Sequence, residues 1–527
     1  MEKKSLFAVF GAILLITSGL TFAGCIQDTE EEGLEIGVQV THTDIVVYWD
    51  PSHSYSNEIT MMHNAYETLT RYDPDDDELK GVLAEDWEVS DDSLTWSFEL
   101  KEGVKFHDGT EMTAEDVKFS FERTIEEEAG ASFLFSAVDE ITAVDDYTVE
   151  FEVNEPTPLD MLSASSYGGF IYSKSKAEEV DNYHDWFNEH NTAGTGPYQV
   201  DEYVQGERLV MKRHDDYRGE WKEDQVDQVI IRKISDATTR RHEIESGEVD
   251  IIERLPYEQY TEAEKDENVE VVKTESFQNI LGMFNTESEP FDDIHFREAV
   301  SWAVPYDDIV EEVYHGDATQ ARGAIPHGMW GHAEDLDQFE MDMEKAEDAL
   351  NQSEYNPEDI EIDATYTSGN SAQERILSLM QAQLDELGID MSIRGMEWSA
   401  QWEKARHEDP DERQDLFVFY WWPDEASPYS WLSNLFMSEE EPYFNLAYYS
   451  NEEVDNLTQE AREKAGIDRD QAEDMYIEAQ QEIMKDVPSL FLVDEMYVRT
   501  VRSEINGYED NPAYPNVVFW YDITIEE

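Results

Sequence analysis

Cysteine is nearly absent from this chain of 527 residues, which contains only Cys25. A single thiol cannot form an internal disulfide or a multi-thiolate metal site, so both are excluded within one chain. Basic residues are also scarce, since 36 Lys and Arg face 124 Asp and Glu to give a net charge of −88. A field of this sign repels phosphate backbones, and we therefore exclude nucleic acid as a partner.

Catalytic motifs and long apolar runs are missing as well. After residue 24, no apolar stretch approaches the ~20 residues that a membrane-spanning helix requires. The chain lacks a phosphate-binding loop, a Gly-x-Ser-x-Gly elbow and a His-Glu-x-x-His pair, and its 13 histidines show no metal-ligand spacing. We therefore predict a protein that is not an enzyme and has no cofactor and no direct metal site.

The acidic residues are spread along a foldable chain. Hydrophobic residues make up 40% and aromatic residues 12% of the sequence, which is too much for a disordered acidic segment. This pattern is typical of the surface of proteins from halophiles. At ~1 M salt the Debye length is only ~3 Å, so the net charge steers few ligands and carries no catalytic meaning.

The first 24 residues have the three parts of a secretory signal. Lys3 and Lys4 form the basic start, residues 6–20 the apolar stretch, and small residues precede Cys25. The segment resembles a lipobox, although Phe22 replaces the usual aliphatic residue. We predict a signal peptide (1–24), lipidation of Cys25 and a charged tether (25–33), with an ordinary signal peptide or an uncleaved anchor helix as alternatives. The protein is then expected at the outer face of the cytoplasmic membrane.

Strand and helix patterns alternate through the rest of the chain and predict a mixed α/β fold. Apolar residues alternate with polar ones in 94–100 and again in 147–153. A capping box at Thr113–Asp116 predicts the start of a helix, and a second one at Ser371–Glu374 predicts another that stops at Gly388.

Several segments, in order, resemble one family. The most specific are Gly103–Val117, with Phe106-His107-Asp108-Gly109 at its centre, and Gly194-Thr195-Gly196-Pro197-Tyr198. Further matches are Trp49–Pro51, Asn64–Leu69, Leu83–Asp91, Gly247–Asp250, Phe296–Val300 and Tyr449–Asp455. The chain thus resembles the large solute-binding proteins of ABC importers, family 5, which includes oligopeptide-, dipeptide- and nickel-binding members. We expect Gly194 and Gly196 to supply backbone angles that other residues avoid.

The resemblance implies a two-lobed periplasmic-binding-protein-like fold with an extra domain and a ligand cleft between lobes. It places a discontinuous lobe I in residues 34–57, 191–277 and 485–527. The extra domain would cover residues 58–190 and lobe II residues 278–484. The implied function is delivery of a di- or oligopeptide to an ABC permease by hinge closure, by a protein that we expect to be a monomer.

The resemblance also points to the ligand contacts. In peptide-binding relatives an Asp near a Trp pairs with the peptide ammonium group, and Asp424 follows Trp421 and Trp422 here. We predict that Asp424 binds the amine, that Trp421 and Trp422 form cleft walls, and that Ser54 and Tyr55 line the cleft. No arginine stands out in the sequence as a partner for a peptide carboxylate.

Other functions stay open on the sequence alone. Tryptophan walls suit sugars as well as peptides, so a binder of an oligosaccharide or of a nickel chelate is the main alternative. An extracellular hydrolase lacks its nucleophile motif here. A sensory receptor domain lacks a membrane span or signalling helix after the domain.

Overall fold

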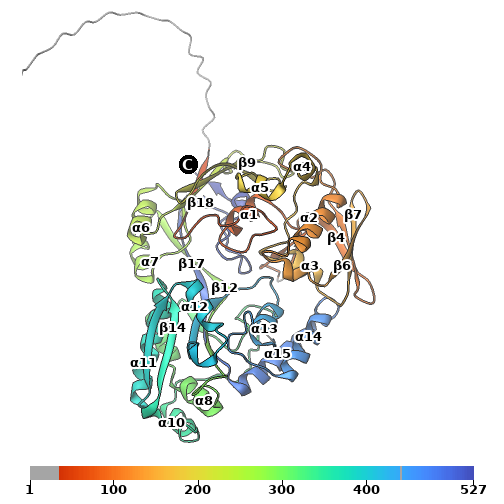
Figure 1. Cartoon of the computed structure of the whole chain (residues 1–527). Helices are drawn as coiled ribbons and strands as arrows, with labels where there is room; N and C mark the ends of the chain where they lie inside the picture. The colour runs from red at the N-terminus through yellow and green to blue at the C-terminus, as the bar shows by residue number, and fades with distance from the viewer. Residues whose placement is uncertain (1–34, 77, 440–441, 527) are drawn as a thin grey trace, which may run out of the picture. The chain divides into compact units, whose positions relative to one another are not determined.

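A sheet of eleven strands organises the molecule (Figure 1). The computed structural model describes residues 35–526 except residues 77 and 440–441, so the predicted signal peptide, Cys25 and the tether lie outside the described residues. The spatial order is β15 (Asp390–Met396), β14 (Glu361–Thr367), β16 (Leu416–Trp421), β12 (Val269–Phe284), β17 (Ser489–Arg502), β11 (Ile251–Ile252), β1 (Ile36–Thr41), β10 (Gln228–Lys233), β9 (Arg208–Arg213) and β8 (Tyr198–Val204), with β13 (Ala318–Gln320) paired to β17.

Two long antiparallel strands, β12 and β17, connect the two halves of this sheet. On one side β12 pairs with β16, and on the other β17 pairs with the short strand β11. Their common register shifts twice, between Glu275 and Asn279 and again between Ile280 and Leu281. Such irregularities bend a strand locally, so the connection between the halves is bent at residues 275–281.

A separate four-stranded antiparallel sheet has the order β4 (Ala84–Val89), β5 (Thr95–Leu100), β7 (Thr148–Val153) and β6 (Val138–Asp145). The strands predicted in 94–100 and 147–153 are confirmed, and Trp96 and Phe98 are buried on one face of β5. The predicted capping box is confirmed at the start of α2 (Ala114–Glu127), where Asp116 accepts from the Thr113 backbone N–H. α2 packs on β6 and β7.

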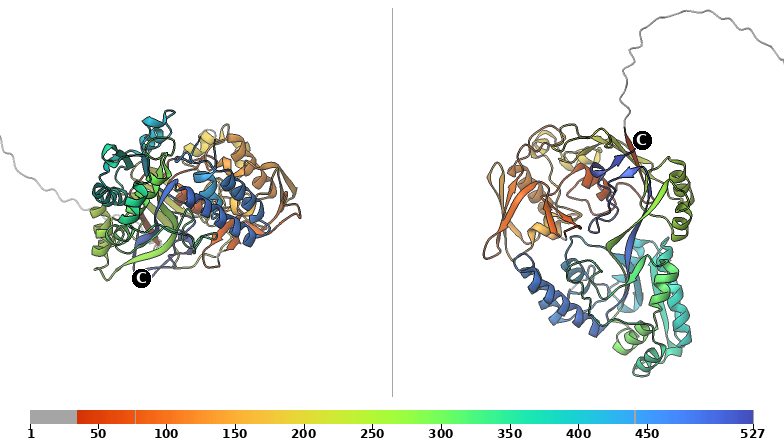
Figure 2. Two further views of the ribbon diagram at one scale, coloured as in Figure 1. Left: turned by 90° about the horizontal axis from the view of Figure 1, so that it is seen from below. Right: turned by 180° about the vertical axis from the view of Figure 1, so that it is seen from behind.

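The second predicted capping box is displaced by one residue. α11 (Ser371–Glu386) begins where expected, but its N-cap is Asn370, whose side chain accepts from the Gln373 N–H at 3.1 Å. Asn is at least as good an N-cap as Ser, so it takes that position. α11 packs on β14 and β15 (Figure 2).

The remaining elements are short or peripheral. Helices are α1 (Ile59–Ala65), α3 (Leu159–Ser163), α4 (Lys174–Glu179), α5 (Tyr183–Asn188), α6 (Ala237–Ser246), α7 (Tyr257–Ala263), α8 (Ile294–Ala303), α9 (Tyr306–Asp308), α10 (Met343–Leu350), α12 (Trp398–Ala405), α13 (Tyr429–Phe436), α14 (Glu452–Ala465) and α15 (Arg469–Asp486). Strands are β2 (Thr70–Asp73), β3 (Glu78–Gly81), β18 (Ile505–Asn506) and β19 (Thr524–Ile525). No helix in the described part of the chain is long and apolar enough to cross a bilayer.

The two most specific sequence motifs contact each other. The His107 backbone N–H donates to the Gly194 carbonyl at 2.9 Å, and the His107 ring lies 3.1 Å from the Gly196 carbonyl. The two glycines serve a different purpose from the one expected, because neither has a positive φ. A Cβ at Gly194 would lie 2.1 Å from the Ala65 carbonyl oxygen, and one at Gly196 would lie 2.5 Å from that of Asn64. Close approach to the end of α1 therefore requires glycine here.

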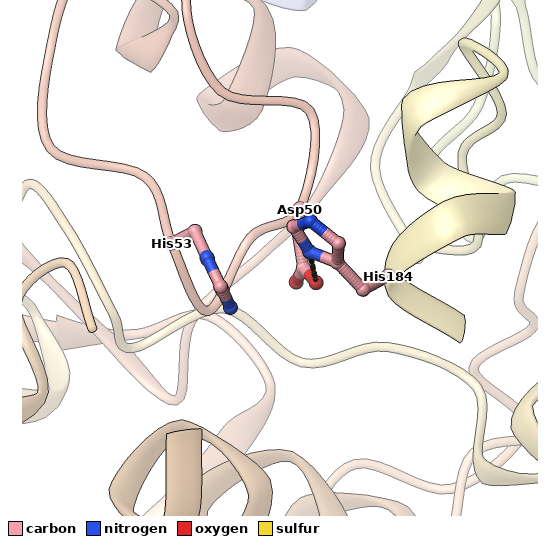
Figure 3. A group of neighbouring side chains, drawn as sticks. All are labelled: Asp50, His53 and His184. Carbon is pink, nitrogen blue, oxygen red and sulfur yellow. Dashed lines mark hydrogen bonds and ion pairs between the residues drawn. The ribbon is translucent and has the colours of Figure 1, made fainter. Parts of the chain in front are cut away.

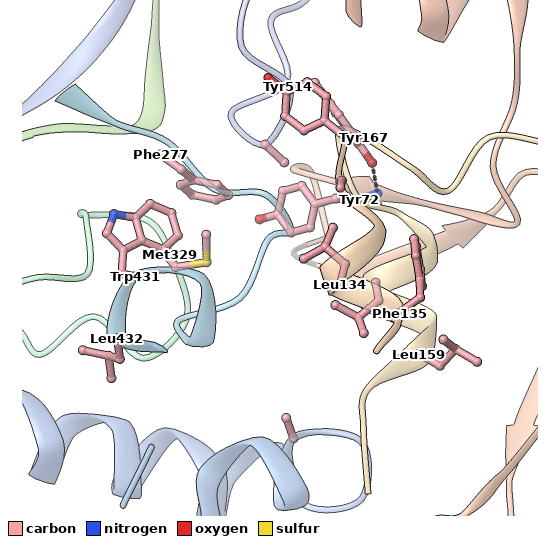
Figure 4. Close-up of a cluster of buried hydrophobic side chains, with 14 of the residues drawn as sticks. Tyr72, Leu134, Phe135, Leu159, Tyr167, Phe277, Met329, Trp431, Leu432 and Tyr514 are labelled. Carbon is pink, nitrogen blue, oxygen red and sulfur yellow. Dashed lines mark hydrogen bonds between the residues drawn. The ribbon is translucent and has the colours of Figure 1, made fainter. Parts of the chain in front are cut away.

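One buried core joins segments that are far apart in the sequence (Figure 4). Tyr72, Leu134 and Tyr167 from the first third of the chain belong to the same cluster as Trp431 and Tyr514. The Tyr72 backbone N–H donates to the Tyr514 hydroxyl at 3.2 Å. The C-terminal segment is thereby fastened to the N-terminal part of the fold, while the exact domain boundaries stay a prediction.

Candidate functional site

A cavity of about 80 Å³ lies where the middle of the large sheet meets the loops after β1 and β16. Its walls come from five strands or strand ends, from the start of α1 and the loop before it, from Tyr167 and from the C-terminal segment. The lining residues include Thr41, His42, Asp44, Ser56, Thr60, Tyr167, Glu253, Arg254, Gln278, Tyr420, Trp422 and Asn516. Because Gln278 belongs to the bent part of β12, the cavity adjoins the connection between the two halves of the sheet.

Aromatic side chains form one wall of this cavity. Tyr420 and Trp422 are stacked, with ring centroids 5.0 Å apart and an interplanar angle of 22°. Tyr167 also lines the cavity, next to Trp422, and contacts Tyr55 at a ring-centroid distance of 4.9 Å. Alternation along a strand explains why Trp421 points the other way, into the core beside Phe444. Flat rings of this kind offer apolar contact without specifying a side chain.

Asp424 follows β16 directly and is buried, with 3% of its surface exposed. Its Oδ1 accepts from the Tyr55 hydroxyl at 3.1 Å and its Oδ2 from the Asn434 amide at 3.3 Å. No Lys, Arg or His of the described residues pairs with it. Burial raises the pKa of Asp424 to about 7, and the hydrogen bonds from Tyr55 and Asn434 oppose that rise. The carboxyl group therefore lacks a cation although it is out of water.

The loop that carries Tyr55 is held by one buried side chain, Glu58, which the sequence did not single out. Its Oε1 accepts from the Ser54 hydroxyl and from the backbone N–H groups of Tyr55 and Ser56, each at 2.9 Å. Its Oε2 accepts from two backbone N–H groups, at residues 47 and 48, each at 3.3 Å. A fully buried carboxylate thus organises the loop and directs the Tyr55 hydroxyl toward Asp424.

The structure brings together part of the predicted site. Tyr55 contacts Asp424, and Trp422 lines the cavity next to Tyr420. Trp421 lies in the core and Ser54 is fully buried against Glu58, so neither lines the cavity. The Tyr55–Asp424 pair also lies outside the cavity lining. Sequence reasoning missed Tyr167, Glu58 and the cavity residues outside 420–424, because they are brought in by long-range packing. The ligand contacts of all five predicted residues stay predictions.

A second cluster joins Asp50, His53 and His184, whose potential ligand atoms lie within 4.8 Å of one another (Figure 3). Asp50 is buried and its Oδ2 lies 2.9 Å from the His184 Nδ1. Arg123 donates to both Asp50 oxygens, at 2.7 and 2.5 Å. A cation here would face the guanidinium and compete for occupied lone pairs, so this arrangement is best described as an ion-pair network.

Comparison with known proteins assigns this geometry to a family. A model for bacterial extracellular solute-binding proteins, family 5, matches residues 78–442. The probable D,D-dipeptide-binding periplasmic protein DdpA of Escherichia coli is 28% identical over 469 residues, covering 88% of this chain and 89% of the relative. Heme-binding protein A of Haemophilus influenzae is 26% identical over 481 residues, covering 85% of this chain and 84% of the relative.

Solved structures agree with the sequence match. The periplasmic binding protein DppA of Helicobacter pylori, in complex with the peptide STSA, superposes with a TM-score of 0.80 at 25% identity and covers 94% of this chain and 99% of its own. NikZ of Campylobacter jejuni, in complex with Ni(L-His), shares the fold with a TM-score of 0.79 at 20% identity. The match covers 93% of this chain and 99% of NikZ. These are two-lobed α/β binding proteins and not enzymes, as predicted, and this chain belongs to the bacterial extracellular solute-binding proteins of family 5.

Proposed function

We propose that this protein binds a peptide outside the cell and delivers it to an ABC importer. Cys25 would carry the lipid that holds it at the outer face of the membrane, with residues 25–33 as a tether. The peptide-binding names of DdpA and of the DppA complex support the ligand class. The lipid anchor rests on the sequence pattern of residues 1–25.

The observation that carries the proposal is the uncompensated carboxyl group of Asp424. A buried carboxylate without a cation is costly, and a peptide ammonium group supplies both the charge and the hydrogen-bond donors. Tyr55 and Asp424 are 369 residues apart in the chain and meet through one hydrogen bond. An amine bound at Asp424 would therefore be held by two distant segments at once, which favours their closed arrangement.

The aromatic wall and the bent strand fit the same function. Tyr420 and Trp422 provide apolar contact, and the irregular pairing of β12 with β17 at residues 275–281 is the place where we propose that closure occurs. Closure around a ligand requires only that a few residues at such a connection change conformation.

Isothermal titration with a panel of di- to pentapeptides tests this function, in parallel with a nickel–histidine chelate and an oligosaccharide. Peptides should bind to the wild type. Asp424→Asn should lower their affinity at least about tenfold, and acetylation of the peptide amine should lower affinity for the wild type by a similar factor. Asp160→Asn is the matched control, because burial raises the pKa of Asp160 to about 6 and this residue, in α3, belongs neither to the cavity lining nor to the Tyr55–Asp424 contact.

Two results would contradict the proposal. One is heat of binding with the chelate or the sugar but with no peptide. The other is equal loss of peptide affinity in the two asparagine variants, which would mean that Asp424 acts through stability alone.

A further inference from the structure

We propose that Arg254 forms an anion subsite of the ligand cavity and binds a carboxylate group of the ligand. This inference rests on the proposed peptide-binding function and adds the charge class of the peptide. The sequence does not reveal the subsite, because Arg254 lies in no motif and its lack of a protein partner is visible only in the fold.

The first observation is the position of Arg254. It follows β11 (Ile251–Ile252), is partly buried, and lines the cavity beside Gln278, Tyr420 and Trp422. Arg254 therefore lines the same cavity as the stacked pair Tyr420 and Trp422, and a ligand bound in that cavity would contact it.

The second observation is that the Arg254 guanidinium makes no hydrogen bond and no ion pair within residues 35–526, as far as these are described. Neighbouring arginines behave differently. Arg240 donates to three backbone carbonyls, including that of Arg254, and Arg499 donates to Asp510 and to the Glu253 carbonyl. An arginine without acceptors is unexpected in a chain with 124 acidic residues, and it indicates a partner outside the protein.

The nearby acids are already occupied. Glu253 also lines the cavity, but its carboxylate accepts from the Gln39 amide at 2.7 Å. Glu495 attracts Arg254 electrostatically without forming an ion pair with it, and its carboxylate accepts from the Gln278 amide. Asp44, a third acid in the lining, pairs with Lys233 at 2.6 Å. None of these three acids therefore forms an ion pair with Arg254, which lines the cavity.

Ligand chemistry follows from these contacts. A planar guanidinium with five donors matches the two oxygens of a carboxylate, and such a pair gains strength when it is partly removed from water. In a peptide the carboxylate is either the C-terminal group or an acidic side chain. Arg254 would bind either carboxylate in the same way, so the experiment has to distinguish the C-terminal group from an acidic side chain.

The test uses four matched peptides with a free amine: neutral or carrying one glutamate, each with a free or an amidated C-terminus. Their dissociation constants are measured by titration calorimetry on the wild type, on Arg254→Gln and on Arg254→Lys. We expect Arg254→Gln to weaken the carboxylate-bearing peptides about tenfold or more and to change the neutral amidated peptide by less than about threefold. The affinity of Arg254→Lys for these peptides should lie between those of the wild type and Arg254→Gln, since lysine keeps the positive charge but lacks the paired N–H donors of a guanidinium.

The pattern among the peptides identifies the source. Loss for the free C-terminus alone assigns Arg254 to the main-chain carboxylate, and loss for the glutamate peptides alone assigns it to a side chain. Arg375→Gln, on the exposed face of α11 and paired with Glu312, removes the same charge away from the cavity and should change none of the four constants.

Equal weakening of all four peptides by Arg254→Gln, or no weakening, would overturn the inference while peptide binding itself stands. No binding of any peptide to the wild type would overturn the proposed function instead. Thermal unfolding of each variant confirms that the comparison is made on folded protein.

Discussion

At the scale of single residues, Asp424 shows a clear physical imbalance between burial and charge. It is buried, and the two side chains that donate hydrogen bonds to it, Tyr55 and Asn434, are neutral. Burial raises its pKa from the ordinary 3.8 to about 7. The adjacent Glu425 is buried too, and burial, followed by the charge of Asp424, raises the pKa of Glu425. The folded protein without ligand therefore prefers the protonated form of Asp424 where the unfolded chain is ionised.

This imbalance predicts a pH dependence of stability. A carboxyl group whose pKa is raised on folding contributes stability below its unfolded pKa and loses it as pH rises through the folded value. From about pH 4 to about pH 7 the free energy of unfolding of the wild type should fall more than that of Asp424→Asn, by an amount on the order of 4 kcal/mol. Urea unfolding of both proteins at several pH values measures the difference, and parallel pH profiles would contradict it.

At the scale of elements, the loop at residues 47–58 depends on Glu58. Five donors converge on this carboxylate, four of them backbone N–H groups. Its removal leaves those groups without an acceptor in a buried place, which costs more than the bonds themselves contribute.

We expect Glu58→Ala to lower the free energy of unfolding by about 3 kcal/mol or more, and to weaken amine binding by releasing Tyr55. Ser54→Ala, which deletes only one of the five donors, should cost about 1 kcal/mol. Chemical denaturation measures both costs. Similar stabilities for the two variants would show that the loop is held by other contacts.

Local elements were largely predictable from the sequence, and the site was predictable only in part. The cap at Thr113 and Asp116 depends on residues three apart, so the pattern alone reveals it. At α11 two good caps are adjacent, and the sequence does not show that Asn370 takes precedence over Ser371. The Tyr55–Asp424 contact and the unpaired state of Arg254 depend on packing between distant segments. Sequence patterns carry no information on such pairing.

At the scale of the whole molecule, the charge of −88 is concentrated on the surface. Only nine acidic residues of the described chain are buried, and these are Asp50, Glu58, Glu67, Asp116, Glu253, Asp424, Glu425, Asp494 and Asp510. The exposed acids repel one another in the folded state more than in the expanded unfolded chain.

Salt should therefore stabilise the protein. Raising KCl from about 0.1 M to about 2 M shortens the Debye length from ~10 Å to below 3 Å, and we expect the unfolding midpoint to rise by several degrees. Differential scanning calorimetry measures the shift. Sucrose at equal osmolality serves as the control, because it does not screen charge. A midpoint that rises equally in sucrose would assign the effect to solvent exclusion instead of electrostatics.

The position of β17 in the sheet also sets the order in which the molecule can be assembled. This strand lies between β11 and β12 and also pairs with β13, yet its residues 489–502 follow all three in the chain. Until those residues leave the ribosome, their partners present open edges and the two halves of the sheet cannot be joined. The large sheet of this chain can therefore be completed only once residues 489–502 are available to pair.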